Sequence, residues 1–140
     1  MKNVFLDTDI LIDFLGDRKP FSKFALSIFV AGYSKTINIY TSSNSITIAY
    51  YILAKQVSEN KARELVLSLM ERLNVIAVSE SILKNAFSSE FRDVEDAVQF
   101  FSALTVERID CIVTRNIRDY KKSTLPVLSS EEFHLKNLSQ

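Results

Sequence analysis

The sequence opens with KNVFLDTDILIDFLG, residues 2–16, and this stretch decides the class of fold. Val4-Phe5-Leu6 is a short apolar run of the kind that forms a buried strand, and Asp7 follows it directly. Residues 10–15 are then apolar at most positions and end at Gly16, which predicts a short helix. A strand, an acidic turn and a helix in this order indicate an α/β fold.

The rest of the chain alternates between strand-like and helix-like segments. Further strands are predicted at residues 36–40, 75–78, 111–113 and 125–128, the last at a sheet edge because it contains proline. Helices are predicted at residues 21–30, 44–56, 59–73 and 93–108, with a further helix after Ser79 or Ser81 and a terminal turn capped within 129–133. Residues 44–56 are ambiguous by propensity, but their length favours a helix. This order predicts a parallel sheet of four to five strands with helices on both faces, a three-layer sandwich.

The composition indicates one folded domain, which we expect to span residues 1–140. Acidic and basic residues number 17 each, so any contact with nucleic acid must be local. The single cysteine, Cys111, allows no intrachain disulfide; we expect it to be buried and the protein to reside in the cytoplasm. Asp7 interrupts the apolar start, unlike a secretory signal, and we expect no membrane association because no apolar run is long enough to cross a bilayer.

Acidic and amide side chains follow the predicted strands, at the edge where parallel sheets bind ligands. Two groups follow strands and a third begins a helix: Asp7 and Asp9, then Asn116 and Asp119, and finally Asp93, Glu95 and Asp96. Carboxylates from such distant segments would repel one another in a shared cleft unless a cation held them. Oxygen ligands select Mg²⁺ or Mn²⁺, and a site of this kind suits phosphodiester hydrolysis without a histidine or serine nucleophile.

Each acidic group also has an ordinary structural interpretation when taken alone. Asp9 could cap the first helix, and the acids at residues 93–96 could complement a helix dipole. Asn116 and Asp119 are residue types that often form turns after strands. The combination of all three groups favours the functional interpretation.

Three motifs give the chain a resemblance to PIN domains. VFLDTDILID at residues 4–13 resembles the opening motif of that family, DVEDAVQ at 93–99 its third acidic motif, and IVTRNIRDY at 112–120 its fourth. The chain looks most similar to the toxin components of VapC-type toxin-antitoxin modules. The resemblance implies a PIN-like fold, an endoribonuclease that depends on Mg²⁺ or Mn²⁺, a cognate antitoxin protein and a homodimer.

The resemblance also assigns roles to residues. Asp7, Asp96 and Asp119 are implied metal ligands, and Asn116 is implied to act with them in catalysis, with Asp9 and Asp93 as secondary candidates. The family usually carries a glutamate in the helix after the second strand, but residues 43–51 contain no acid. Asn44 and Ser45 are the secondary candidates for a neutral oxygen there.

A local cationic strip follows the last acidic motif. It contains an aromatic residue, Tyr120, and four basic residues, Arg115, Arg118, Lys121 and Lys122. The basic side chains could bind RNA phosphates and the tyrosine could stack on a base; a solvated loop is an equally supported alternative.

Two other functions are consistent with the same residues. The missing glutamate favours a catalytically weakened PIN-fold module that binds RNA or an antitoxin. Asp7-Thr8-Asp9 also resembles the paired aspartates of haloacid-dehalogenase-like phosphohydrolases, although Ile10-Leu11 replaces the glycine and threonine that continue that motif.

Overall fold

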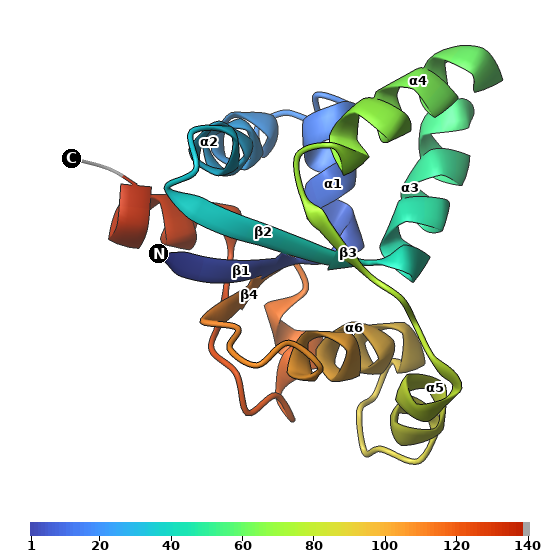
Figure 1. Ribbon diagram of the computed structural model, residues 1–140, viewed down its shortest axis with the longest axis vertical. Helices are drawn as coiled ribbons and strands as arrows, with labels where there is room; N and C mark the ends of the chain where they lie inside the picture. Colours follow the sequence, from blue (N-terminus) through green and yellow to red (C-terminus); the bar gives the residue numbers. More distant parts are fainter. Residues whose placement is uncertain (139–140) are drawn as a thin grey trace.

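The protein is described by a computed structural model over residues 1–138, and a five-stranded parallel sheet lies at its centre (Figure 1). The strand order is β3-β2-β1-β4-β5. The strands are β1 (Lys2–Leu6), β2 (Ile37–Ser42), β3 (Asn74–Ile76), β4 (Cys111–Val113) and β5 (Val127–Leu128). The predicted parallel sheet is confirmed, and its edge strand β5 follows Pro126, whose missing N–H is tolerated there.

Helices cover both faces of the sheet, as the three-layer prediction requires. On one face lie α1 (Thr8–Leu15), α2 (Ser22–Tyr33), α3 (Ser43–Ala54) and α4 (Glu59–Met70), and on the other lie α5 (Glu80–Phe87) and α6 (Val94–Leu104) (Figure 1). A 3₁₀ turn, η1 (Ile117–Tyr120), follows β4, and the described chain ends in α7 (Ser130–Phe133) and a π-helical turn, η2 (His134–Leu138). None of the helices within residues 1–138 is long and apolar enough to span a bilayer.

Alternation along β1 divides the core between the two faces. Val4 and Leu6 pack with α1, α2 and α3, whereas Phe5 packs with α6 on the opposite side. All three side chains are fully buried, which is expected for the central strand of a sheet covered on both faces. Burial of each contributes about 1.5–3 kcal/mol. Cys111 is buried, as predicted.

The strand register brings the carboxyl ends of three strands to one edge. Leu6 pairs with Val113, and the backbone N–H of Asp7 continues the ladder to the Val113 carbonyl at 3.0 Å. Ser42 ends β2 and caps α3, so α3 starts directly at the sheet edge. The first residues after β1, β2 and β4 are therefore neighbours in space.

Two helix starts differ from the sequence interpretation. Asp7, rather than Asp9, is the N-cap of α1, because the helix begins one residue after the strand and the Asp7 carboxylate accepts from the Thr8 N–H at 2.7 Å. Asp93 lies outside α6 as its N-cap and accepts from the Glu95 N–H at 2.8 Å. Both carboxylates are thereby placed at helix starts that face the sheet edge.

Candidate metal centre

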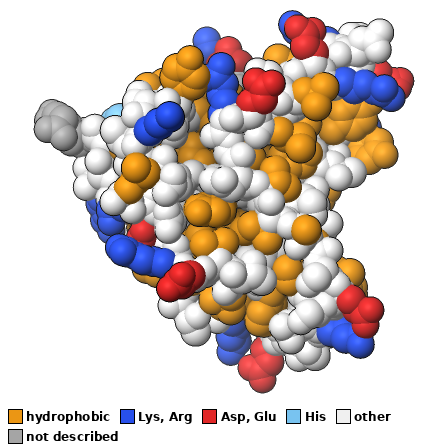
Figure 2. All heavy atoms as spheres, viewed as in Figure 1, with side chains coloured by type: hydrophobic (Ala, Val, Ile, Leu, Met, Phe, Trp, Pro, Cys, Tyr) orange, Lys and Arg blue, Asp and Glu red, His pale blue; other side chains and the backbone are white. Residues whose placement is uncertain are grey.

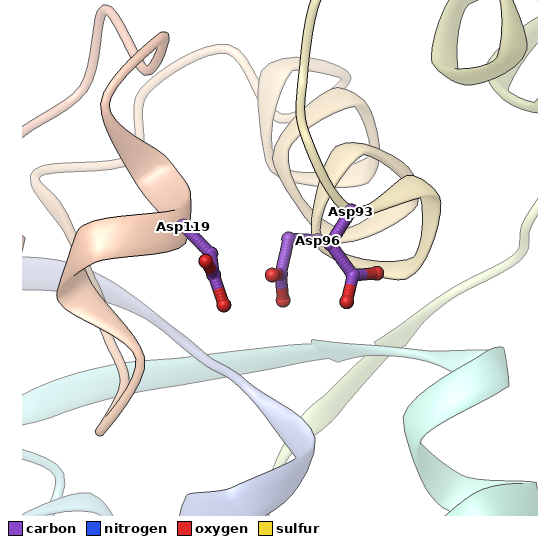
Figure 3. A group of neighbouring side chains, drawn as sticks. All are labelled: Asp93, Asp96 and Asp119. Carbon is purple, nitrogen blue, oxygen red and sulfur yellow. The ribbon is translucent and has the colours of Figure 1, made fainter.

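Three carboxylates from two segments converge beside the sheet edge. Asp93 and Asp96 come from the start of α6, and Asp119 comes from η1; one oxygen of each lies within 4.8 Å of the others. Their side chains point in the same direction, with Asp96 between the other two (Figure 3). Oxygen atoms at this spacing can share one hard divalent cation.

Asp96 is the buried member of this group. Its side chain is 4% exposed, and its Oδ2 atom has no hydrogen-bond partner among the described residues. Burial first, and then the charges of Asp7, Asp93, Asp119 and Glu95, raise the pKa of Asp96 to about 8. Because no donor among the described residues meets Oδ2, a bound cation would favour the ionised form of this carboxyl.

Asp7 lies behind this group and is held by four donors from the protein. Oδ1 accepts from the Thr8 N–H at 2.7 Å and the Gln99 amide at 3.0 Å. Oδ2 accepts from the Thr114 hydroxyl at 2.7 Å and the Tyr120 hydroxyl at 3.0 Å. Asp7 is near enough to raise the pKa of both Asp96 and Glu95. Direct metal ligation by Asp7, as the resemblance implies, would require it to release one of these donors.

Tyr120 has a different place from the one expected. Its side chain is 2% exposed, and burial together with the Asp7 and Asp96 charges raises its pKa far above the usual range. The expectation that Tyr120 stacks on an RNA base is wrong, because the ring is buried and contacts Phe91 edge-on. Its hydroxyl instead donates to Asp7.

Neutral side chains occupy the space where α3 approaches Asp7. The Gln99 amide donates to Asp7 and to the Ser45 hydroxyl, and its oxygen accepts from the Ser42 hydroxyl. Ser45 also shares a hydrogen bond with Thr8 at 2.8 Å. Asn44, the other secondary candidate, is half-buried at the start of α3.

Sequence reasoning did not select Gln99, although a signal was present. Gln99 lies three residues after Asp96 and is 1% exposed, between the buried residues Val98 and Phe100. A buried glutamine flanked by apolar residues in a helix indicates a buried polar partner. Thr8, Ser42 and Thr114 carried no comparable signal, because their hydroxyls are common at strand ends and caps.

A second acidic pair lies on the α1 side of Asp7. Asp9 accepts from the Arg115 N–H at 3.0 Å, and burial and the Asp7 charge raise its pKa to about 7. Asp13 is fully buried and accepts from Arg115 Nε at 2.9 Å; burial raises its pKa even so. Arg115 is thus fixed within the protein, and its guanidinium also lies 4.5 Å from the Phe21 ring centre.

The remaining predicted residues lie along η1 and beyond. Asn116 is exposed, and its carbonyl accepts from the Asp119 N–H at 3.0 Å. Arg118 and Lys121 are exposed, whereas Lys122 lies 3.8 Å from Glu90 in an exposed ion pair. Arg118 and Lys121 are therefore better placed than Lys122 to contact phosphates.

The sheet edge opens into a hollow. On the side where β2 ends, the surface is indented between the α3–α4 layer and α5 (Figures 1 and 2). Hydrophobic side chains lie on both sides of this indentation (Figure 2). A polymeric ligand could approach the sheet edge from this side.

The fold and the site define a class of protein: a parallel α/β domain with a cluster of carboxylates at the carboxyl edge of its sheet. The PIN domain family model matches residues 3–118 of this chain. The chain therefore belongs to the PIN domain family, and the resemblance predicted from its three motifs is confirmed.

Relatives and solved structures agree with this assignment. Ribonuclease VapC1 of Aquifex aeolicus is 24% identical over 138 residues, which cover 94% of this chain and 93% of the relative. VapBC-1 from nontypeable Haemophilus influenzae is similar with a TM-score of 0.67 and 17% identity, over 92% of this chain and 98% of that one. A toxin-antitoxin complex from Klebsiella pneumoniae is similar with a TM-score of 0.64 and 22% identity, over 91% and 97% of the two chains. The PIN-like fold is confirmed.

Proposed function

We propose that this protein is a metal-dependent endoribonuclease whose ion is held by Asp96 and Asp119, with Asp93 as the third ligand. The observation that carries the proposal is the buried, unpartnered Oδ2 of Asp96 beside the carboxylates of Asp93 and Asp119. Asp7 orients the centre from behind and is the fourth candidate ligand. Asn116 contributes through its carbonyl, which holds the turn that carries Asp119.

The donor set fits a hard cation. The ligand atoms are carboxylate oxygens, which favour Mg²⁺ or Mn²⁺ over zinc. When bound, such an ion supplies Lewis-acid charge for the hydrolysis of a phosphodiester. The chain's own residues hold Asp7 through Thr114, Tyr120 and Gln99, and they keep Asp96 out of bulk water.

RNA is the proposed substrate, and Arg118 and Lys121 are the proposed phosphate contacts. The Aquifex relative is named a ribonuclease, which supports this choice of substrate. The Klebsiella structure is a toxin-antitoxin complex, which supports an antitoxin partner for this chain. A homodimer, a single domain over residues 1–140 and a cytoplasmic location complete the proposal.

Isosteric variants test the centre. In Asp96→Asn and Asp119→Asn, calorimetric titration with Mn²⁺ should show at least about tenfold weaker binding, because each removes a charged ligand. Cleavage of single-stranded RNA should fall in parallel. Asp17→Asn is the matched control, since Asp17 is exposed and distant from the acidic group along the chain. Wild-type affinity and cleavage in both site variants would refute the proposal.

One observation favours a second function, a weakened PIN module that binds RNA or antitoxin. The α3 helix brings Ser45 rather than an acid toward Asp7, so fewer charges surround the ion. Saturable Mn²⁺ binding without RNA cleavage would support this alternative. The phosphohydrolase alternative lacks support, because the chain belongs to the PIN family and Asp7 accepts hydrogen bonds from four donors.

A further inference from the structure

A cavity of about 530 Å³ lies beside the segment that joins β4 to η1. Its lining includes Phe21, Lys23 and Phe24 at the start of α2, together with residues 129–131 at the start of α7. Arg115 and Asn116, in the segment that leads to Asp119, also line the cavity. Its volume lies within the range of pockets that bind small ligands.

Two pairs of a cation and an aromatic ring line this cavity. The Arg115 guanidinium lies 4.5 Å from the Phe21 ring centre, and the Lys23 ammonium lies 4.9 Å from that of Phe24. Phe21 is 38% exposed, so part of its surface remains open although it touches Arg115. The ion pair with buried Asp13 fixes the guanidinium. Aromatic rings and guanidinium planes are the surfaces on which proteins stack unpaired bases.

The cavity is linked to the acidic centre through a short, hydrogen-bonded segment. Asn116 lines the cavity, and its carbonyl accepts from the N–H of Asp119, a member of the carboxylate group. Three residues span at most about 11 Å even when extended. A strand of RNA whose phosphate lies at the carboxylates can therefore place a neighbouring base in the cavity.

We propose that this cavity is the binding site for a nucleobase next to the scissile phosphate, a subsite that rests on the proposed ribonuclease function. The base stacks on Phe21 or on the Arg115 guanidinium, and Lys23 contacts the adjoining phosphate. The Asn116 amide and the Glu131 carboxylate at the rim offer hydrogen bonds to the base edge. Glu131 disfavours a free phosphate in the same space, because like charges repel.

The test combines ring variants with abasic RNA. Phe21→Leu keeps a bulky apolar side chain but removes the aromatic face, while Phe21→Tyr retains that face. Tyr33→Ala is the matched control, because Tyr33 also is an exposed ring under an arginine, Arg72 at 4.2 Å, but lies outside the cavity. KM, kcat and Mn²⁺ affinity are measured on oligonucleotides that carry one abasic nucleotide at successive positions around the cut.

Loss of base stacking should raise KM about 5- to 150-fold in Phe21→Leu, with kcat and Mn²⁺ affinity unchanged. Phe21→Tyr and Tyr33→Ala should retain wild-type KM. An abasic nucleotide at one position should raise the wild-type KM to the value that Phe21→Leu has on intact RNA. On that same abasic RNA, Phe21→Leu should show no further increase in KM. Equal KM for Phe21→Leu and wild type on intact RNA overturns the subsite and leaves the ribonuclease proposal standing.

A separate outcome concerns the ribonuclease itself. If the wild type cleaves no RNA with Mn²⁺, the proposed function fails. Fluorescence anisotropy with the same oligonucleotides in EDTA then decides the subsite. Weaker binding of one abasic RNA by the wild type, but not by Phe21→Leu, supports the subsite, and equal binding of all RNAs by both proteins overturns it.

Discussion

Replacement of Asp96 by asparagine should stabilise the metal-free protein against unfolding. It should also remove the additional stabilisation that bound Mn²⁺ gives the wild type. The pKa of Asp96 is about 8 in the folded protein, against an ordinary value of 3.8 for an aspartate in the unfolded chain. Because the folded pKa is raised, this group's contribution to stability is greatest below pH 3.8 and is lost progressively as the pH rises toward 8. Asparagine has nearly the same shape and no charge, so it avoids that loss.

The magnitude follows from the pKa difference. At pH 7 the Asp96 carboxyl is mostly protonated in the folded protein and ionised in the unfolded chain. The difference between pH 7 and the unfolded pKa is about 3 pH units, and each unit corresponds to about 1.36 kcal/mol, so protonation on folding costs about 4 kcal/mol of stability. Relaxation of the surrounding side chains reduces the cost, so we expect Asp96→Asn to gain about 1–4 kcal/mol in EDTA at pH 7. For a chain of this length the gain raises Tm by about 3 °C or more.

Thermal unfolding followed by circular dichroism measures both parts of this prediction. Mn²⁺ at about 100 times its Kd should stabilise the wild type by about 2.7 kcal/mol and should have little effect on the variant. The stability difference in EDTA should shrink as the pH falls from 8 to 4. Asp17→Asn, the exposed control, should follow the wild type in both buffers. A variant that is less stable than wild type in EDTA at pH 7, or one that gains as much from Mn²⁺, refutes the reasoning.

Three further predictions concern contacts around the centre. Gln99→Leu leaves buried hydroxyl and carboxylate partners unsatisfied and should cost about 2–4 kcal/mol in urea unfolding; a loss below about 0.5 kcal/mol would contradict the network. Arg115→Met should lower the free energy of unfolding by about 3–5 kcal/mol, because the buried Asp13 carboxylate loses its ion-pair partner. Adding Asp13→Leu should recover much of that loss. No recovery would show that the ion pair is not the cause. Gly32→Ala places a Cβ against Ile39, whose Cγ1 lies at 3.1 Å and whose Cδ1 is closer, so it should lower the free energy of unfolding by about 1–3 kcal/mol. Adding Ile39→Val, which removes Cδ1, should reduce that loss. An unchanged Tm in Gly32→Ala alone would argue against the contact.

The fold could be predicted from the sequence because its signals are local and agree with one another. Apolar runs marked the strands, and Cys111–Val113 was predicted at its observed bounds. Helix ends were less accurate: the helix predicted to reach Arg108 ends at Leu104, since the apolar pattern does not show where a hydrogen-bonded turn replaces the helix.

The candidate site was only partly accessible to the same reasoning. Because strands in a parallel sheet share a carboxyl edge, the pattern indicated that Asp7, Asp96 and Asp119 would approach one another. It did not show that Asp93 rather than Asp7 would lie with the other two, or that Tyr120 would turn inward. Both depend on side-chain directions at a cap and in a 3₁₀ turn, which residue spacing does not specify.

The missing acid on α3 and the buried Gln99 are parts of one arrangement. A carboxylate that entered from α3 beside Asp7 would add a second buried negative charge, which only the bound ion could compensate. Here the Gln99 amide donates to Asp7 and to Ser45, so α3 adds no charge beside Asp7 and the amide takes the place of a second carboxylate. The charge that attracts an ion is consequently concentrated on Asp93, Asp96 and Asp119. Introducing Ser45→Glu would therefore not simply complete the site, because the new carboxylate would displace the amide that orients Asp7.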